Sequence, residues 1–575
     1  MIGYEIPKKV LGFEGKVYNY SEKSRVPMNI EFDFPTSDDN ECHEVGQKVK
    51  RYGSSAIYSC ENQDIITPLK KIIMIQAFDN LQLFISRLIK VDPFVDQIHL
   101  INNEIFNIVV PKNISNSHLF ITVTTRPCIP GVVGYATPIN FDEINNRPTQ
   151  GTINICPAYV PEKASSFESN ENRFINVMFH ELVHVFGFSG RLFKYWLNRA
   201  TGKEWGNDLP FTQYTDPRFP NKKFNILHTP QSHKYASKRW KSEKFAPGVP
   251  MGIEIEDGGG SGTMGSHPES RISYGEVMCG IAQENLVISD MVLSLIEDMG
   301  WYSVNFSYAK PLHWGDYSSF GENQPKNIHK DPPQIAFPKH YFCSEEDDLK
   351  LSCGYDFKTI AQCYLLKKNC PGTTDNEKLF CSEQGFYNPL NKSYYGEDGR
   401  FDFMPIKSEM VSLPINHFCF HSNPKIPDVS IAPPFLLKQV ECNSQKTAYN
   451  VTIFGKVYYC DSDSKEILFD ETNPLYTSFK CSSPKIICEG IEFDKKPILQ
   501  PSRVPFPNDP TEETITTPTS IPSSTSQSKT STITLILSII SIIGNICMIY
   551  IAIDYIKLKS RINDEETSNL TKVLV

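Results

Sequence analysis

The most informative segment of the chain reads Phe174-Ile-Asn-Val-Met-Phe-His180-Glu181-Leu-Val-His184-Val-Phe-Gly187-Phe-Ser189-Gly190. Apolar residues occupy nearly every side of this segment when it is drawn as a helix, so we predict a buried helix. Residues four apart lie one above the other on a helix, which places His180 and His184 on the same face. Two imidazoles one turn apart can bind the same zinc ion.

Glu181 has a position suited to a general base rather than to a ligand. It follows His180 directly and points about 100° further around the helix axis. From there its carboxylate can reach a water on the metal. The alternative is that this spacing arose by chance in an ordinary buried helix. Histidine is scarce, with 13 in 575 residues, and an unpaired glutamate in so apolar a helix is costly. We therefore predict a zinc site.

Length and charge limit the classes of protein that fit. At 575 residues the chain is too long for one core, so several domains are expected. A hydrophobic content of 40% is enough for packed globular domains. The net charge of −9 is mild for this length and indicates that nucleic acid is not a main partner.

The cysteines point to an oxidising compartment, because sixteen is a high number for a cytosolic protein. Five lie in the first 300 residues, one lies near the end, and ten form a block: Cys343, Cys353, Cys363, Cys370, Cys381, Cys419, Cys442, Cys460, Cys481 and Cys488. The block contains no Cys-x-x-Cys, which favours disulfides over zinc knuckles. The early set is odd in number, so one of its members is expected to be free. Five sequons also favour secretion: Asn19, Asn113, Asn305, Asn391 and Asn450.

A membrane anchor is predicted near the C-terminus. Residues 533–553 form 21 positions without a charge, which is long enough to cross a bilayer. Lys557, Lys559 and Arg561 follow at once, so the positive-inside rule places the C-terminus in the cytoplasm and the rest outside. The first residues contain no apolar signal sequence, and we expect that the N-terminus is truncated.

Ahead of the histidine helix, the apolar pattern predicts a layered α+β arrangement. Residues 26–35 alternate as a strand does, and residues 66–90 have the period of a long helix. Residues 119–125 and 151–156 are predicted strands on either side of a Pro/Gly-rich turn. A further helix begins at the capping residue Ser289 and ends at Gly300.

A catalytic zinc ion needs a third protein ligand, which the histidine helix does not supply. The downstream candidates are His228, His233, His267 and His313. The first two adjoin a basic stretch at residues 234–244, a poor setting for a buried dication. His267 lies in a glycine-rich segment, residues 257–271, where backbone can pack tightly. We therefore favour His267.

This set of motifs resembles the leishmanolysin family of the metzincin clan, in its membrane-anchored form. The matching pieces are residues 180–190, then a long insertion, then Gly265-Ser266-His267, Glu276-Val-Met278 and Glu297-Asp-Met-Gly-Trp-Tyr302. Gly190 stands where a compact metzincin motif has its third histidine. The segments that begin at Cys42 and Cys60 also resemble the start of that family's mature enzyme. The resemblance extends over residues 27–315 and weakens beyond them.

The resemblance implies a zinc endopeptidase with one Zn²⁺ bound by His180, His184 and His267. Glu181 would be the catalytic base, and Met278 would form the Met-turn beneath the histidines without being a ligand. Protein or peptide substrates outside the cell are implied as partners.

The resemblance also bears on the early cysteines. It favours a disulfide between Cys42 and Cys60 over a latency cysteine. Cys279 follows the Met-turn methionine and is the candidate for the free cysteine, which would leave Cys128 and Cys156 to pair.

The predicted organisation is an α+β, metzincin-like catalytic domain with a long insertion between the zinc ligands, a disulfide-rich, mostly β or irregular domain, and one transmembrane helix. The segments are an N-terminal piece 1–25, a catalytic subdomain 26–190, the insertion with the third ligand and Met-turn 191–315, a cysteine-rich domain 316–498, a Pro/Ser/Thr stalk 499–530, a transmembrane helix 531–554 and a cytoplasmic tail 555–575.

Together these features predict a single-pass plasma-membrane glycoprotein that cleaves extracellular proteins and also takes part in cell adhesion. One alternative is a catalytically silent adhesion protein on the same fold, and another is hydrolysis of a non-peptide amide. The intact Glu181 favours catalysis, because a silent scaffold has no chemical need for it. Cleavage preference, physiological substrate, the pairing within the cysteine block and oligomeric state do not follow from the sequence.

Overall fold

The computed structural model describes much of the chain between Ser24 and Asp494. The described residues are 24–51, 56–93, 97–102, 110–111, 113–161, 173–217, 222–316, 341–343, 349–366, 395–413, 417–424, 435–437, 440–453, 455–470 and 476–494. No helix within these ranges is both long and apolar enough to cross a bilayer. The predicted stalk, transmembrane helix and tail lie outside them, as do Cys370, Cys381 and Cys547.

The helices of the described chain are α1 (Pro68–Leu88), α2 (Arg173–Phe186), α3 (Pro230–Trp240), α4 (Ser270–Ser273), α5 (Asp290–Asp298) and α7 (Pro484–Asp494). The long helix α1 confirms the prediction over residues 66–90. Thr67 caps it, since its side chain accepts a hydrogen bond from the Lys70 amide, and Pro68 occupies its first turn. Ser289 caps α5 in the same way, as predicted.

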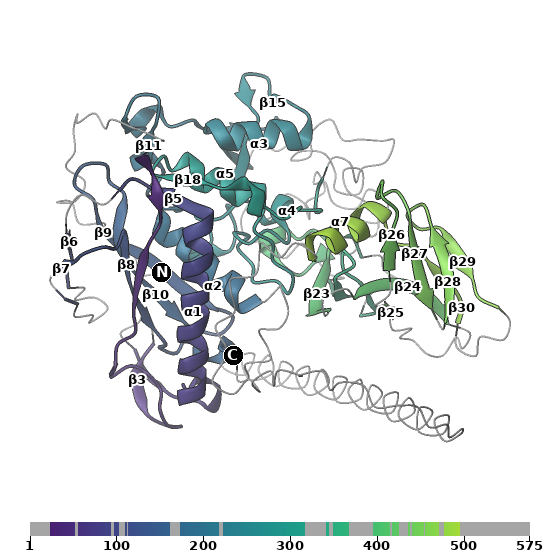
Figure 1. Ribbon diagram of the computed structural model, residues 1–575, viewed down its shortest axis with the longest axis horizontal. Coiled ribbons are helices and arrows are strands. Elements are labelled where there is room, and N and C mark those ends of the chain that lie inside the picture. Colours follow the sequence, from purple (N-terminus) through teal and green to yellow (C-terminus); the bar gives the residue numbers. More distant parts are fainter. Residues whose placement is uncertain are drawn as a thin grey trace, which may run out of the picture. The chain divides into compact units, whose positions relative to one another are not determined.

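One four-stranded sheet carries the histidine helix α2. Its strands are β2 (Ile30–Asp33), β8 (Leu119–Thr124), β10 (Pro148–Ile155) and β9 (Gly134–Phe141), in that spatial order. β2, β8 and β10 run parallel to one another, and β9 runs antiparallel to β10. Helix α2 packs against β9 and β10 and also against its neighbour α1 (Figure 1).

Strand β9 corrects the predicted Pro/Gly-rich turn between residues 125 and 151. Pro138, one of the residues of the predicted turn, lies in the middle of this strand, although proline cannot donate to a sheet ladder. A terminal strand tolerates it, since only one of its edges pairs with the sheet. The terminal position also explains the half-buried side chains of β9, whereas every residue of the central β10 is buried.

The predicted strand over residues 26–35 is divided in two. β1 (Val26–Pro27) pairs with β5 (Ile89–Val91), which pairs in turn with β18 (Tyr302–Val304), while β2 belongs to the main sheet. The chain changes sheets just after Pro27, the residue that lacks an amide hydrogen. Alternation of apolar and polar residues continues across this break and therefore does not reveal it.

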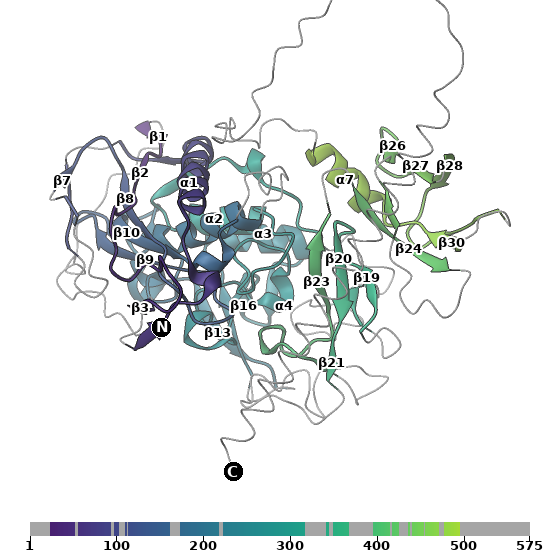
Figure 2. The same ribbon diagram turned by 90° about the horizontal axis from the view of Figure 1, so that it is seen from below.

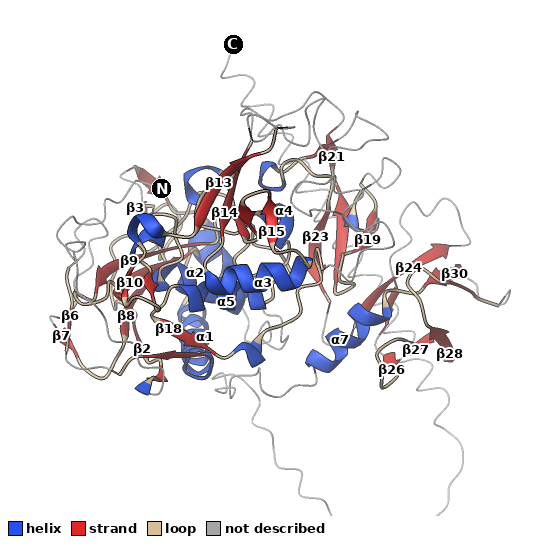
Figure 3. Cartoon of the chain, turned by 90° about the horizontal axis from the view of Figure 1, so that it is seen from above, coloured by secondary structure: helices blue, strands red, loops and turns tan. Residues whose placement is uncertain are grey.

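The insertion between Gly190 and His267 is a folded unit with its own sheets. Its strands are β11 (Leu197–Asn198), β12 (Lys203–Glu204), β13 (Phe211–Thr215), β14 (Lys223–Leu227), β15 (Lys244–Ala246), β16 (Val249–Pro250) and β17 (Ile253–Ile255). Helix α3 lies beside α5 (Figure 3), and the carboxylate of Asp298 accepts hydrogen bonds from Thr229, Gln231 and Ser232 at the start of α3. The insertion is thereby packed onto α5.

The described part of the cysteine-rich segment is mostly β, as predicted. Its strands are β19 (Leu351–Cys353), β20 (Thr359–Cys363), β21 (Leu365–Leu366), β22 (Tyr395–Gly396), β23 (Lys407–Ser412), β24 (Phe418–Pro424), β25 (Phe435–Leu437), β26 (Val440–Cys442), β27 (Tyr449–Ile453), β28 (Lys456–Cys460), β29 (Glu466–Leu468) and β30 (Tyr476–Lys480). They form antiparallel sheets such as β19-β20-β23 and β25-β24-β30-β29 (Figure 2). A second hydrophobic core, from Cys353 to Ile491, lies within this segment.

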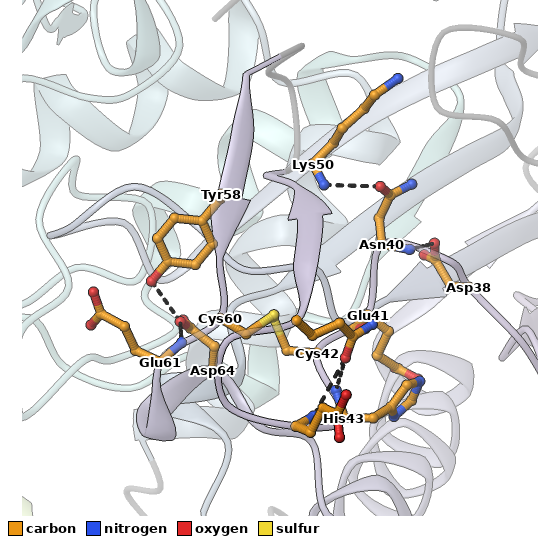
Figure 4. The surroundings of a disulfide bond; sticks show 12 residues. Asp38, Asn40, Glu41, Cys42, His43, Lys50, Tyr58, Cys60, Glu61 and Asp64 are labelled. Carbon is orange, nitrogen blue, oxygen red and sulfur yellow. Dashed lines mark hydrogen bonds and ion pairs between the residues drawn. A yellow bond between two sulfur atoms is a disulfide. The ribbon is translucent and has the colours of Figure 1, made fainter.

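The disulfides confirm the two pairings predicted for the early cysteines. Cys42 pairs with Cys60 beside the hairpin of β3 (Lys48–Lys50) and β4 (Ile57–Ser59), where the Tyr58 hydroxyl donates to Asp64 (Figure 4). The other described pairs are Cys128–Cys156, Cys343–Cys363, Cys353–Cys419, Cys442–Cys488 and Cys460–Cys481. Cys279 is buried and free, as predicted.

A small separate sheet pairs β6 (Ile98–His99) with β7 (Asn113–Ile114).

The close contact between β10 and α2 gives a first prediction. A Cβ atom at Gly151 would lie 2.4 Å from Val185 of α2 and 3.1 Å from the Thr137 carbonyl oxygen. We expect Gly151→Ala to lower the free energy of unfolding by about 1–3 kcal/mol, because neither neighbour can move without shifting the sheet or the helix. Chemical denaturation measures this change.

Gly262→Ala is the matched control, because a Cβ at Gly262 meets nothing within 4 Å. Its effect on stability should stay within about 0.5 kcal/mol. If the two variants unfold at the same denaturant concentration, the contact between β10 and α2 is not as tight as described.

Candidate active site

Three imidazoles from two distant parts of the chain converge at one point. His180 and His184 lie one turn apart on α2, and His267 lies in the loop between β17 and α4. Their Nε2 atoms are separated by 3.1 Å (His180 to His184), 3.2 Å (His184 to His267) and 3.2 Å (His180 to His267). Each of the three offers one ligand atom to a shared metal position.

Each imidazole is oriented through its other nitrogen by a main-chain carbonyl. The Nδ1 atoms of His180, His184 and His267 lie 2.7, 2.9 and 2.9 Å from the carbonyl oxygens of Val277, Phe188 and Thr263. A carbonyl oxygen can only accept, so each Nδ1 must carry the hydrogen. Each Nε2 therefore presents its lone pair to the other two.

These lone pairs suit a cation better than a proton. Burial, together with the neighbouring His184, lowers the pKa of His180 to about 3. The pKa values of His184 and His267 also fall below the ordinary value because of burial. A tetrahedral zinc ion with ligand distances of about 2.0–2.1 Å requires nitrogens about 3.3 Å apart. The observed separations fit that geometry, and an all-imidazole set is one that zinc prefers.

The other histidines considered as ligands lie elsewhere. His228 contacts the Thr212 hydroxyl at 2.9 Å, and His233 contacts the Met251 carbonyl oxygen at 2.7 Å. His313 is buried and lies 3.7 Å from a Glu489 carboxylate oxygen.

Glu181 is buried on α2 beside the histidines, with 6% of its surface exposed. Burial raises the pKa of its carboxyl group to about 8. Gly134, the first residue of β9, lies next to this carboxyl group, since an added Cβ at Gly134 would lie 2.7 Å from Glu181 Oε1. The absence of a side chain at residue 134 therefore leaves the space that the carboxylate occupies.

The segment around Met278 closes the site from another direction. Val277 supplies the carbonyl that orients His180, and its amide donates to the Val287 carbonyl oxygen at 2.9 Å. Glu276 holds the turn, because its carboxylate accepts hydrogen bonds from the Met278 amide at 2.5 Å and the Ser289 hydroxyl at 3.2 Å. Met278 itself is fully buried. Its packing beneath the histidines stays a prediction.

A family comparison agrees with this site. Residues 19–382, more than half of the chain, match the model of peptidase family M8, described as leishmanolysin. The chain belongs to the leishmanolysin family. This is a family of zinc-dependent metalloendopeptidases, and the match extends beyond residue 315 into the cysteine-rich segment.

Individual relatives of the leishmanolysin family share about a quarter of their residues with the chain. Leishmanolysin of Leishmania major is 25% identical over 444 residues, covering 73% of this chain and 68% of the relative. Leishmanolysin-like peptidases of Drosophila pseudoobscura pseudoobscura and Drosophila melanogaster are 28% and 27% identical, over 46% and 42% of this chain. The matches cover only 42% and 39% of those two relatives, so the chain spans less than half of their length.

Several features of this leishmanolysin-family site could not be found from the sequence. The orienting groups of the histidines are main-chain carbonyls, which any residue type can supply. Gly134 lies in a segment that was expected to turn. Glu276 belongs to the motif that contains Met278, but its role as a hydrogen-bond acceptor for the turn is visible only in the structure. The sequence signal that could have revealed this role is a glutamate directly followed by apolar residues, because such a glutamate needs a partner when buried.

The convergence of the imidazoles gives a second prediction. We expect His267→Ala to weaken zinc binding by more than about 100-fold, because even changes to groups that only orient a ligand cost 10–100-fold. Elemental analysis of the purified protein measures the bound zinc. His228→Ala is the matched control and should retain full zinc occupancy. Equal zinc content in the two variants would contradict the assignment of His267.

Proposed function

We propose that this chain is a cell-surface zinc endopeptidase that hydrolyses peptide bonds of extracellular proteins, with Glu181 as general base. The observation that carries the proposal is the burial of Glu181 next to three converging imidazoles whose lone pairs face one another. Family membership supports the reaction class.

His180, His184 and His267 would hold the zinc ion, which would supply a Lewis acid able to acidify water near neutral pH and to polarise a carbonyl group. Glu181 then accepts the proton of the attacking water as the new C–O bond forms. It delivers this proton to the amine nitrogen as the C–N bond breaks. The three carbonyl-bound Nδ1 hydrogens keep the imidazoles in one tautomer and one orientation.

The proposed substrate is a peptide in an extended conformation rather than a non-peptide amide. β9 is the terminal strand of the main sheet, and its first residue, Gly134, lies against Glu181. An extended chain can add to a terminal strand through main-chain hydrogen bonds, which do not depend on sequence. A peptide aligned along β9 would pass beside the general base.

The proposed location outside the cell rests on the covalent chemistry of the chain. Disulfides persist in oxidising compartments, and the described residues contain several. The sequon asparagines Asn113, Asn305 and Asn450 are exposed. Anchoring through residues 531–554, with the stalk holding the enzyme away from the bilayer, completes the proposal. A role in adhesion would use the exposed surface of this same extracellular part of the chain.

The third prediction tests the general base. Glu181→Gln should lower kcat for cleavage of an unfolded protein by about 10²–10⁴-fold, because a glutamine of the same shape cannot accept the proton. Bound zinc should be unchanged. Equal activity in the two proteins would contradict the mechanism, and a wild type that binds zinc but cleaves nothing would favour the silent adhesion protein.

The fourth prediction concerns the space left by Gly134. We expect Gly134→Ala to lower kcat by about 10²-fold through displacement of the Glu181 carboxylate. Zinc content should stay at the wild-type level. Thr137→Ala on the same strand is the control and should keep kcat within a few-fold. A Gly134→Ala enzyme with the wild-type kcat would show that β9 does not confine Glu181.

A further inference from the structure

Five buried carboxylates gather behind the loop that presents His267. They come from the end of β17, the start of α4 and the cysteine-rich segment: Glu254, Glu256, Asp257, Glu269 and Asp402. Burying this many carboxylates together is costly unless cations or hydrogen bonds offset their charge. Their partners therefore decide what the cluster can bind.

Two buried cations neutralise only part of this charge. Arg271 contacts both oxygens of Glu254 at 2.9 Å and Asp402 at 3.1 Å. Lys222 lies 2.8 Å from Asp257 Oδ2 and 3.6 Å from Asp402 Oδ1. The nearby Arg400 forms its ion pair with Asp398, outside the cluster.

Glu256 and Glu269 form no ion pair within the described residues. Glu256 accepts hydrogen bonds from the Gly258 amide at 2.8 Å and from the amide and hydroxyl of Ser270 at 3.0 and 2.7 Å. Glu269 is 1% exposed, yet its Oε2 atom has no hydrogen-bond partner in the described part of the chain. Its Oε1 receives only a long contact of 3.4 Å, from the Arg271 amide.

The unpartnered carboxylate faces two others. Glu256, Asp257 and Glu269 each present an oxygen within 4.8 Å of the oxygens of the other two. We propose that these three residues bind a second divalent cation, of the calcium class. All the available ligand atoms are oxygens, which calcium prefers, whereas zinc prefers nitrogen and sulfur.

A cation at this position would stiffen the loop that presents His267. The Glu256 amide donates to the His267 carbonyl oxygen at 2.9 Å, and the Gly265 amide donates to the Glu256 carbonyl oxygen at 2.8 Å. Glu256 is thus hydrogen-bonded to both Gly265 and His267, and Glu269 follows His267 by two residues. The second cation would act on the structure of the loop and not on the reaction itself.

Calcium binding to the full-length, zinc-loaded protein tests the proposal directly. Equilibrium dialysis against ⁴⁵Ca²⁺ should find about one calcium per chain, and Ca²⁺ should raise the thermal unfolding midpoint in a saturable manner. Glu269→Gln should abolish both effects while zinc content stays unchanged. In the absence of calcium this variant should be at least as stable as wild type, because it removes a buried charge without a partner.

Glu256→Gln provides a second variant with the same expected result. Glu441→Gln, which changes an exposed carboxylate of β26, is the control and should bind calcium like wild type. A wild type that binds no calcium, or either cluster variant that binds it as wild type does, would overturn the proposal. Cleavage assays play no part in this readout, so failure here is distinct from failure of the proposed protease activity.

Discussion

Mutual repulsion among three imidazole lone pairs is the constraint around which this fold is arranged. Nitrogens held 3.1–3.2 Å apart, each with its hydrogen on the far side, repel one another unless a cation lies among them. Three carbonyl oxygens hold the rings in this arrangement. They come from the end of α2, from the loop before His267 and from the turn at Met278, so three separate parts of the chain must be in place together.

The insertion satisfies that requirement through one short contact. The Gly190 amide donates to the Gly265 carbonyl oxygen at 2.7 Å, which joins a residue four positions after the end of α2 to a residue two positions before His267. A Cβ at Gly190 would lie 2.6 Å from that oxygen, so the close approach requires glycine. Everything between the two residues can fold as a unit outside the site. The third candidate ligand is therefore not three residues after Gly187. It is His267, which lies in the loop that follows β17, the last strand of the insertion.

Sequence reasoning succeeded where side-chain type carries the information. The spacing of His180 and His184, the glycines around His267 and the capped helix after Ser289 each required particular residues, and each element is present. It failed where main chain or tertiary context carries the information. The Pro/Gly-rich segment between residues 125 and 151 indicated a turn, and nothing local reveals that it contains a terminal strand. The break after Pro27 was hidden because both halves keep the same alternation.

The arrangement around Glu181 explains why burial and catalysis are compatible here. Burial alone raises the pKa of this carboxyl group to about 8, which favours the protonated form at neutral pH. A base must instead be ionised before it can accept a proton. A dication among the three imidazoles would favour the carboxylate, since an opposite charge nearby offsets desolvation. Gly134 leaves room for the Glu181 carboxylate near that dication, because any side chain at residue 134 would occupy the same volume. In the proposed mechanism, the same metal that the three histidines would hold would also keep Glu181 ionised as a base.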